Sequence, residues 1–135
     1  MQIVLALVLS SALAAGAYSD DQWKSHMTAL KQKVPEAGFT VVRQSPFVII
    51  GDEAPEKLRS RAEGTVKWAV DHLKDLYFDK DPTEIIDIWL FKDAASYRKH
   101  CKMIFNDEPD TPFGYFSSTH NALIMNIETG GGTLV

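Results

Sequence analysis

The side chains best suited to metal or acid–base chemistry in this sequence are its four histidines. They stand at positions His26, His72, His100 and His120. Two histidines four positions apart on a helix can hold one zinc ion, and a glutamate directly after the first can take a proton from the metal-bound water. No two of these histidines are four positions apart, and none is followed by glutamate. The sequence therefore predicts no metal ligand and no catalytic residue in this chain.

The other reactive side chains have structural interpretations. Cys101 is the only cysteine, so no intrachain disulfide can form, and its place in an amphipathic stretch indicates a buried small side chain. Asp87 interrupts an apolar run, and a buried carboxylate needs a partner, so we expect a helix lysine or a backbone N–H beside it. His72 and His100 are expected at surface or flanking positions of helices. His120 is expected in a solvated turn, and its role stays open.

Composition limits the classes of function. The 135 residues are 45% hydrophobic and 24% charged, which suits one small soluble domain with its own core. The net charge is −4, whereas a general nucleic-acid-binding protein should present a basic face to the phosphates. We therefore expect no nucleic-acid partner.

Residues 1–17 have the pattern of a secretory signal peptide. The run Ile3–Ala15 is apolar except for two serines and is too short to cross a bilayer comfortably. The small residues that end at Ala17 suit signal peptidase, so we expect cleavage after Ala17. The mature protein is then secreted or periplasmic, without stable membrane insertion. The alternative is an uncleaved N-terminal anchor, because no lysine or arginine precedes the apolar run.

The chain after residue 17 begins with a predicted helix and strand pair. Asp20 or Asp21 can cap a helix that runs to about Val34. Residues 39–42 and 47–50 are rich in β-branched and aromatic side chains, which indicates two short strands or one bent strand.

A long amphipathic helix is predicted next. Pro55 suits its first turn, and Gly64 is its weak point. Its apolar stripe has steps of three and four, and the members are Leu58, Ala62, Val66, Ala69, Leu73 and Tyr77. Residues 85–91 then read as a buried central strand, and Asp93 can cap another helix.

A β-hairpin is predicted near the end of the chain. Residues 114–116 and 122–127 form its strands, and residues 117–121 form its turn. The element order predicts an α+β fold, with a small mixed sheet, two or three amphipathic helices and a C-terminal hairpin. We expect a single domain of residues 18–135.

The last seven residues suggest that this domain is incomplete at its C-terminus. Thr129-Gly130-Gly131-Gly132-Thr133-Leu134-Val135 is a glycine-rich approach to an element with an apolar face. The sequence supplies only the first residues of that element.

Together these features resemble a known family. Residues 45–135 are similar to the upstream half of a gluzincin-type zinc metallopeptidase domain, of the peptidase MA-like group of exported bacterial proteins. The similar pieces are Ser45-Pro46-Phe47-Val48-Ile49-Ile50-Gly51-Asp52 and the long helix after it, Ile85 to Phe91 followed by Asp93-Ala94-Ala95-Ser96-Tyr97, Gly114-Tyr115-Phe116, Asn121-Ala122-Leu123-Ile124-Met125-Asn126, and Thr133-Leu134-Val135.

The resemblance implies a function for a complete homologue. There, a zinc-binding helix with the His-Glu-x-x-His motif follows the Thr-Leu-type run, and a peptide or protein is the substrate. In this chain we expect no cofactor, so it is interpreted as the N-terminal part of a secreted zinc metallopeptidase-like protein that is not catalytically competent as given. The resemblance also implies that the returning hairpin strand is a sheet edge beside the cleft. Its candidate substrate-binding residues are Ala122, Leu123, Ile124, Met125 and Asn126.

Two alternatives stay open at this point. The hairpin can be purely structural, since many sheet edges bind nothing. The whole chain can be a complete, non-catalytic exported α+β binding module, with residues 130–135 as a tail.

Overall fold

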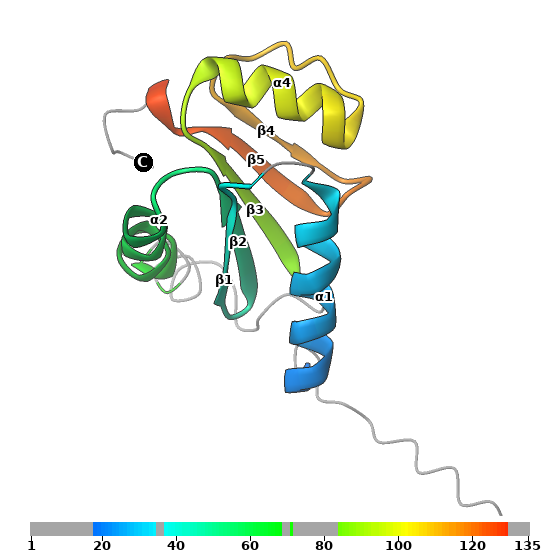
Figure 1. Cartoon of the computed structure of the whole chain (residues 1–135), viewed down its shortest axis with the longest axis vertical. Coiled ribbons are helices and arrows are strands. Elements are labelled where there is room, and N and C mark those ends of the chain that lie inside the picture. Colours follow the sequence, from blue (N-terminus) through cyan, green and yellow to red (C-terminus); the bar gives the residue numbers. More distant parts are fainter. Residues whose placement is uncertain (1–17, 35–36, 69–70, 72–83, 130–135) are drawn as a thin grey trace, which may run out of the picture.

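Five strands form one mixed sheet in the computed structural model, which describes residues 18–34, 37–68, 71 and 84–129 (Figure 1). The strand order across the sheet is β1-β2-β3-β5-β4. The three central strands run parallel, and each outer strand runs antiparallel to its neighbour. The strand bounds are β1 Thr40–Gln44, β2 Phe47–Gly51, β3 Ile86–Phe91, β4 Gly114–Ser117 and β5 Ala122–Asn126.

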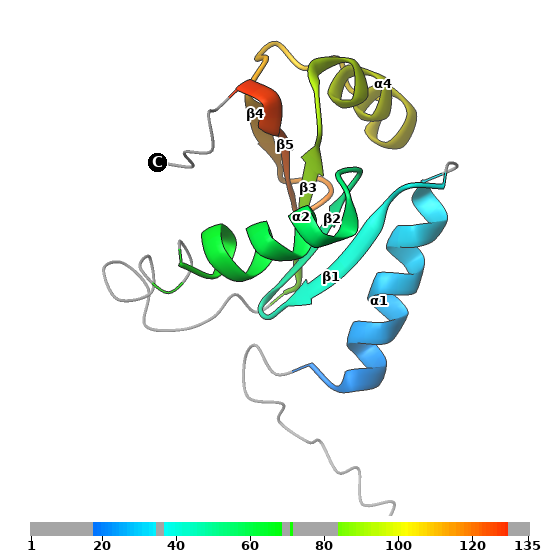
Figure 2. The ribbon, with the colours of Figure 1, turned by 60° about the vertical axis from the view of Figure 1, so that its left-hand side comes forward.

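Helices lie on both faces of this sheet. α1 (Asp20–Lys33) and α4 (Ala94–Phe105) pack on one face. α2 (Pro55–Arg61) and the π-helical turn η1 (Ala62–Val66) pack on the other. Figure 2 shows the sheet between these two layers. The expected α+β fold with a small mixed sheet is therefore confirmed.

Helix α1 is capped by Ser19, and not by Asp20 or Asp21 as expected. Ser19 Oγ accepts a hydrogen bond from Gln22 N at 3.2 Å, and Gln22 Oε1 accepts one from Ser19 N at 2.8 Å. This capping box satisfies two backbone donors that have no partner within the helix. The two aspartates lie in the first turn, where negative charge interacts favourably with the helix dipole.

The expected long helix changes geometry at residues 62–66, which contain Gly64. A π turn contains more residues than an α turn, so residues four apart stay on one face. Three members of the predicted stripe are accordingly buried, namely Leu58, Ala62 and Val66. The others, Ala69, Leu73 and Tyr77, lie outside the described residues, as does His72.

Strand β3 occupies the middle of the sheet, as its apolar pattern predicts. It pairs in parallel with both β2 and β5. Trp89 and Phe91 are buried on the α1–α4 face, and Ile88 and Leu90 on the α2 face. Both faces of the strand are covered, which explains why it shows no polar alternation.

Helix α4 follows β3 directly and is capped as expected. Asp93 Oδ1 accepts a hydrogen bond from Ser96 N at 2.8 Å. The helix ends at Asn106, whose left-handed backbone (φ 54°) is typical of a helix C-terminus.

The segments that predict export and the glycine-rich approach, residues 1–17 and 130–135, lie outside the described residues. Among the residues that are described, no helix combines the length and the apolar character needed to span a membrane.

Candidate functional site

The predicted hairpin is present, but its outer strand is β4 and not β5. β5 pairs with β3 on one side and with β4 on the other. The expectation that Ala122–Asn126 is a sheet edge is therefore wrong. The sequence identifies two adjacent strands, but it does not say which of them pairs with β3. β5 pairs in parallel with β3, so Gly114–Ser117 of β4 is the outermost strand on this side of the sheet.

The backbone of β4 presents hydrogen-bonding groups to the outside. Asn126 N donates to Phe113 O at 2.9 Å, and the register then places Tyr115 opposite Ile124. In an antiparallel pair, alternate residues bond to the neighbouring strand. Residues 113, 115 and 117 therefore bond to β5, while Gly114 and Phe116 direct their backbone N–H and C=O groups outward. We call Gly114–Ser117 the β4 edge.

Gly114 allows β4 to lie against β5. Its φ is +153°, and a Cβ atom there would lie 2.5 Å from the carbonyl oxygen of Ile124. Only glycine fits this combination of backbone conformation and close approach. The strand therefore needs glycine at its first position.

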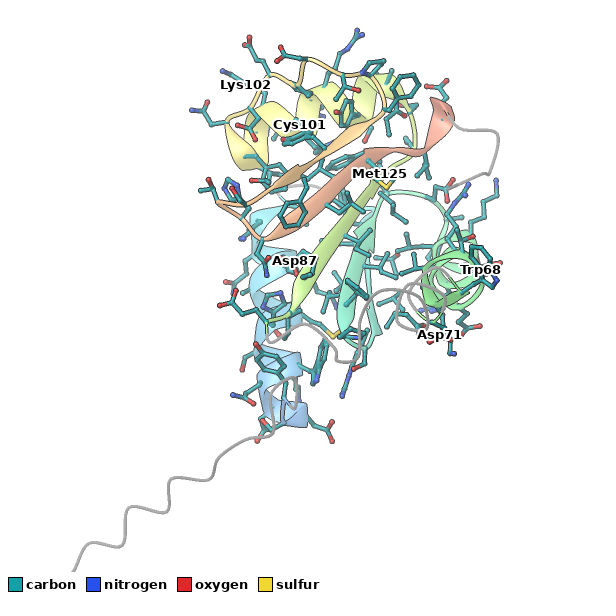
Figure 3. The ribbon with its side chains drawn as sticks, turned by 180° about the vertical axis from the view of Figure 1, so that it is seen from behind. Trp68, Asp71, Asp87, Cys101, Lys102 and Met125 are labelled. Carbon is teal, nitrogen blue, oxygen red and sulfur yellow. The ribbon has the colours of Figure 1, made fainter. Side chains whose placement is uncertain are left out.

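The two faces of the hairpin differ in burial. Ala122, Ile124 and Asn126 of β5 are buried on the α1–α4 side. On the α2 side, Leu123 and Met125 are only partly buried, and Phe116 opposite Leu123 is 54% exposed. Figure 3 shows Met125 on this side, beside the helix α2. The described helices thus leave an apolar surface next to the β4 edge.

The loop before β4 is held by side-chain hydrogen bonds. Asn126 Nδ2 donates to Pro112 O at 3.1 Å, and Tyr97 Oη donates to Thr111 O at 2.9 Å. In the strand itself, Tyr115 Oη donates to Asp107 Oδ2 at 2.8 Å, on the same α4 side of the sheet. These bonds fix the position of the β4 edge relative to α4.

Asp87 has a different partner from the one expected. The carboxylate is buried on the α1 side of β3, and its Oδ1 lies 2.6 Å from Nε2 of His26 (Figure 3 labels Asp87). Burial raises the pKa of Asp87, and the contact with His26 and the charge of Lys33 oppose that shift. The expected lysine therefore acts only through its charge, and histidine is the hydrogen-bonding partner.

His100 is buried, with 4% of its surface exposed, so the expectation of a surface position is wrong. It lies three residues after Tyr97 and so shares the inward face of α4. Its ring stacks on Phe91 at 5.4 Å, and its Nδ1 lies 2.8 Å from the carbonyl oxygen of Ser96. Ser96 Oγ in turn donates to the carboxylate of Asp52. This network joins the C-terminal end of β2 to the first turn of α4.

Cys101 is buried as expected. Burial raises the pKa of its thiol to about 11, so little thiolate exists at neutral pH. The pKa of the neighbouring Tyr115 is raised as well, chiefly by burial. His120 lies in the hairpin turn as expected, but it is partly buried and not simply solvated, with Nδ1 3.0 Å from Ser117 Oγ and its ring against Phe105.

Within the described ranges, no group of three histidine, cysteine, aspartate or glutamate side chains is placed to hold a metal ion. The donor set that catalytic zinc needs, three protein ligands around one point, is not supplied by these residues. We therefore assign no chemical step to a metal in this part of the chain.

Comparison of the chain with protein-family models, with curated proteins and with solved structures finds no significant match. The function of the β4 edge is therefore inferred from its geometry alone. Sequence reasoning missed Gly114 and Phe116 as its outward-facing residues. The signal was a short aromatic strand that begins with glycine, Gly114-Tyr115-Phe116-Ser117.

Proposed function

We propose that residues 18–129 form the upstream scaffold of an exported zinc metallopeptidase-like protein, and that the β4 edge of this scaffold pairs with an extended peptide. The observation that carries the proposal is the outward backbone of Gly114 and Phe116 at the antiparallel edge of the sheet. An extended peptide can add to such an edge through main-chain hydrogen bonds.

The side chains around the edge support the same proposal. Phe116 is 54% exposed on the α2 side, where Leu123 and Met125 continue the apolar surface, and Phe113, just before the strand, is 62% exposed. A peptide paired with β4 places alternate side chains on this surface. In the proposed full-length protein, the zinc-binding helix would follow residue 135. The role of the residues present here is to bind and orient a peptide, and no hydrolytic step is assigned to them.

The peptide half of the proposal is tested with a fluorescein-labelled Val-Thr-Val-Thr-Val peptide, which has no charged side chains. Fluorescence anisotropy should show saturable binding. Hydrogen exchange of the amides in residues 114–117 should slow when the peptide is present, because outward N–H groups gain partners. Binding without slower exchange in these residues would show that the peptide does not pair with β4.

The metallopeptidase part of the proposal is tested by reading the nucleotide sequence of the gene. The coding sequence after the Val135 codon should encode His-Glu-x-x-His within a few codons, in the same frame or after one insertion or deletion. If no frame encodes it, the non-catalytic binding module replaces the metallopeptidase scaffold, and the peptide test above still applies to it.

A further inference from the structure

A second surface lies at the opposite edge of the sheet, in a groove of about 300 Å³ between helix α1 and strand β1. Trp23 and Met27 of α1 form its apolar floor. Lys24, Lys31 and Arg43 are exposed along it. We call this feature the α1–β1 groove, and it shares no residue with the β4 edge.

The groove is cationic in a chain whose net charge is −4. The three cations face one carboxylate, Asp20, which Arg43 already holds through an Nη1–Oδ1 contact of 2.9 Å. Neither Lys24 nor Lys31 makes an ion pair with another described residue. Two lysine charges are therefore available to an anionic partner.

Arg43 is already ordered in this arrangement. Its Cζ lies 4.5 Å from the centroid of the Trp23 ring, in a cation–π contact, and its Nη1 also donates to Asp20 Oδ1 at 2.9 Å. An ordered arginine loses little further conformational freedom on binding. The groove is thus partly organised before any partner arrives.

Strand β1 adds a backbone site to the charged groove. Among the described strands it pairs only with β2, so its outer side has backbone N–H and C=O groups that no strand uses. Natural proteins commonly place cations beside such an edge, which prevents like-charged edges from pairing. The same cations would attract a strand that carries carboxylates.

We propose that the α1–β1 groove binds an acidic, extended peptide segment of a partner protein, which adds to β1 as a sixth strand. Lys24 and Lys31 are seven residues apart on α1, which corresponds to about 10 Å along the helix. A strand advances about 3.3 Å per residue. Carboxylates two or four positions apart share one face of the peptide and are about 7 or 13 Å apart, which brackets the spacing of the two lysines.

The proposal is tested with a fluorescein-labelled Glu-Val-Glu-Val-Glu peptide and a matched Lys-Val-Lys-Val-Lys peptide, at low salt. The acidic peptide should bind and the basic one should not. The double variant Lys24→Glu/Lys31→Glu should weaken binding at least 10-fold. Lys57→Glu, an exposed change on α2, should leave the affinity within twofold of wild type. Equal affinity of the wild type and the double variant would overturn the proposal.

Hydrogen exchange separates this site from the β4 edge. With the acidic peptide bound, the amides of residues 40–44 should exchange more slowly, while those of residues 114–117 should not change. Slower exchange only at residues 114–117 would overturn the present inference and leave the proposed function standing. Binding of anionic phosphatidylserine vesicles, without binding of the acidic peptide, would show a membrane-binding surface instead and would also overturn it.

Discussion

His26 Nε2 lies 2.6 Å from Asp87 Oδ1 and so joins helix α1 to the central strand of the sheet. Asp87 is flanked in the sheet by Val48 and Ala122, which are both buried. A charged carboxylate in such apolar surroundings is costly unless a donor reaches it. His26 of helix α1 supplies that donor. The burial of the Asp87 carboxylate in β3 therefore depends on the packing of α1 against the sheet.

Replacement of His26 by alanine should therefore destabilise the fold. We expect the free energy of unfolding at pH 7 to fall by about 1–2 kcal/mol, because Asp87 loses its donor. His26→Gln should recover part of this loss, because its amide N–H can also donate. Urea unfolding measures both variants. An unchanged stability of His26→Ala would show that the contact contributes nothing.

The pH dependence of stability should report on Asp87. Burial raises its pKa above the ordinary value of 3.8, so the folded state keeps this proton to higher pH than the unfolded state does. The stabilisation from the bound proton is complete below the unfolded pKa and is lost as pH rises through the folded pKa. Asp87→Asn does not titrate. Relative to wild type, it should therefore gain stability between pH 3 and pH 7.

Urea midpoints of wild type and Asp87→Asn across this range measure the effect. Asp110→Asn, at an exposed carboxylate, serves as the control and should follow the wild type. A constant difference between Asp87→Asn and wild type from pH 3 to pH 7 would contradict the raised pKa.

Local sequence patterns were sufficient for most elements of the fold. Asp93 was correctly identified as a helix cap, because an aspartate directly before an amphipathic run commonly accepts a hydrogen bond from a backbone N–H of the first helical turn. The apolar run of β3 correctly predicted a strand covered on both faces. The π turn around Gly64 was missed, because residue spacing alone does not distinguish it from an α-helix.

The site was harder to predict because it depends on pairing between distant segments. The order of β4 and β5 in the sheet depends on which of the two pairs with the distant strand β3, and no local pattern encodes that choice. The contact of His26 with Asp87 spans 61 positions of the chain. Burial of His100 was predictable in principle, because three-residue spacing from Tyr97 places it on the inward stripe.

Gly114→Ala should destabilise the hairpin. The added Cβ meets the carbonyl oxygen of Ile124 at 2.5 Å, on a backbone that already has a positive φ. We expect a loss of about 2–3 kcal/mol in urea unfolding. Gly64→Ala is the matched control, because a Cβ there meets nothing within 4 Å. It should keep or raise the stability, by up to about 1 kcal/mol. Equal effects of the two changes would contradict the packing of β4.

The thiol of Cys101 should be unreactive in the folded protein. Its pKa is raised from 9.0 to about 11, and the side chain is fully buried. Because the thiolate is the reactive form, labelling by a disulfide reagent at pH 8 should be at least about 100-fold slower than in urea. Fast labelling of the folded protein would show that the α4–β4 contact opens readily.

The outward backbone N–H of Phe116 gives the most direct test of peptide pairing at the β4 edge. Phe116→Pro removes that N–H without removing a bond to β5, and proline is tolerated on edge strands. Phe116→Ala removes the ring but keeps the N–H. In anisotropy titrations with the Val-Thr-Val-Thr-Val peptide, Phe116→Pro should weaken binding at least 10-fold more than Phe116→Ala, with both variants folded by circular dichroism. Equal affinities of the two variants would contradict main-chain pairing at β4.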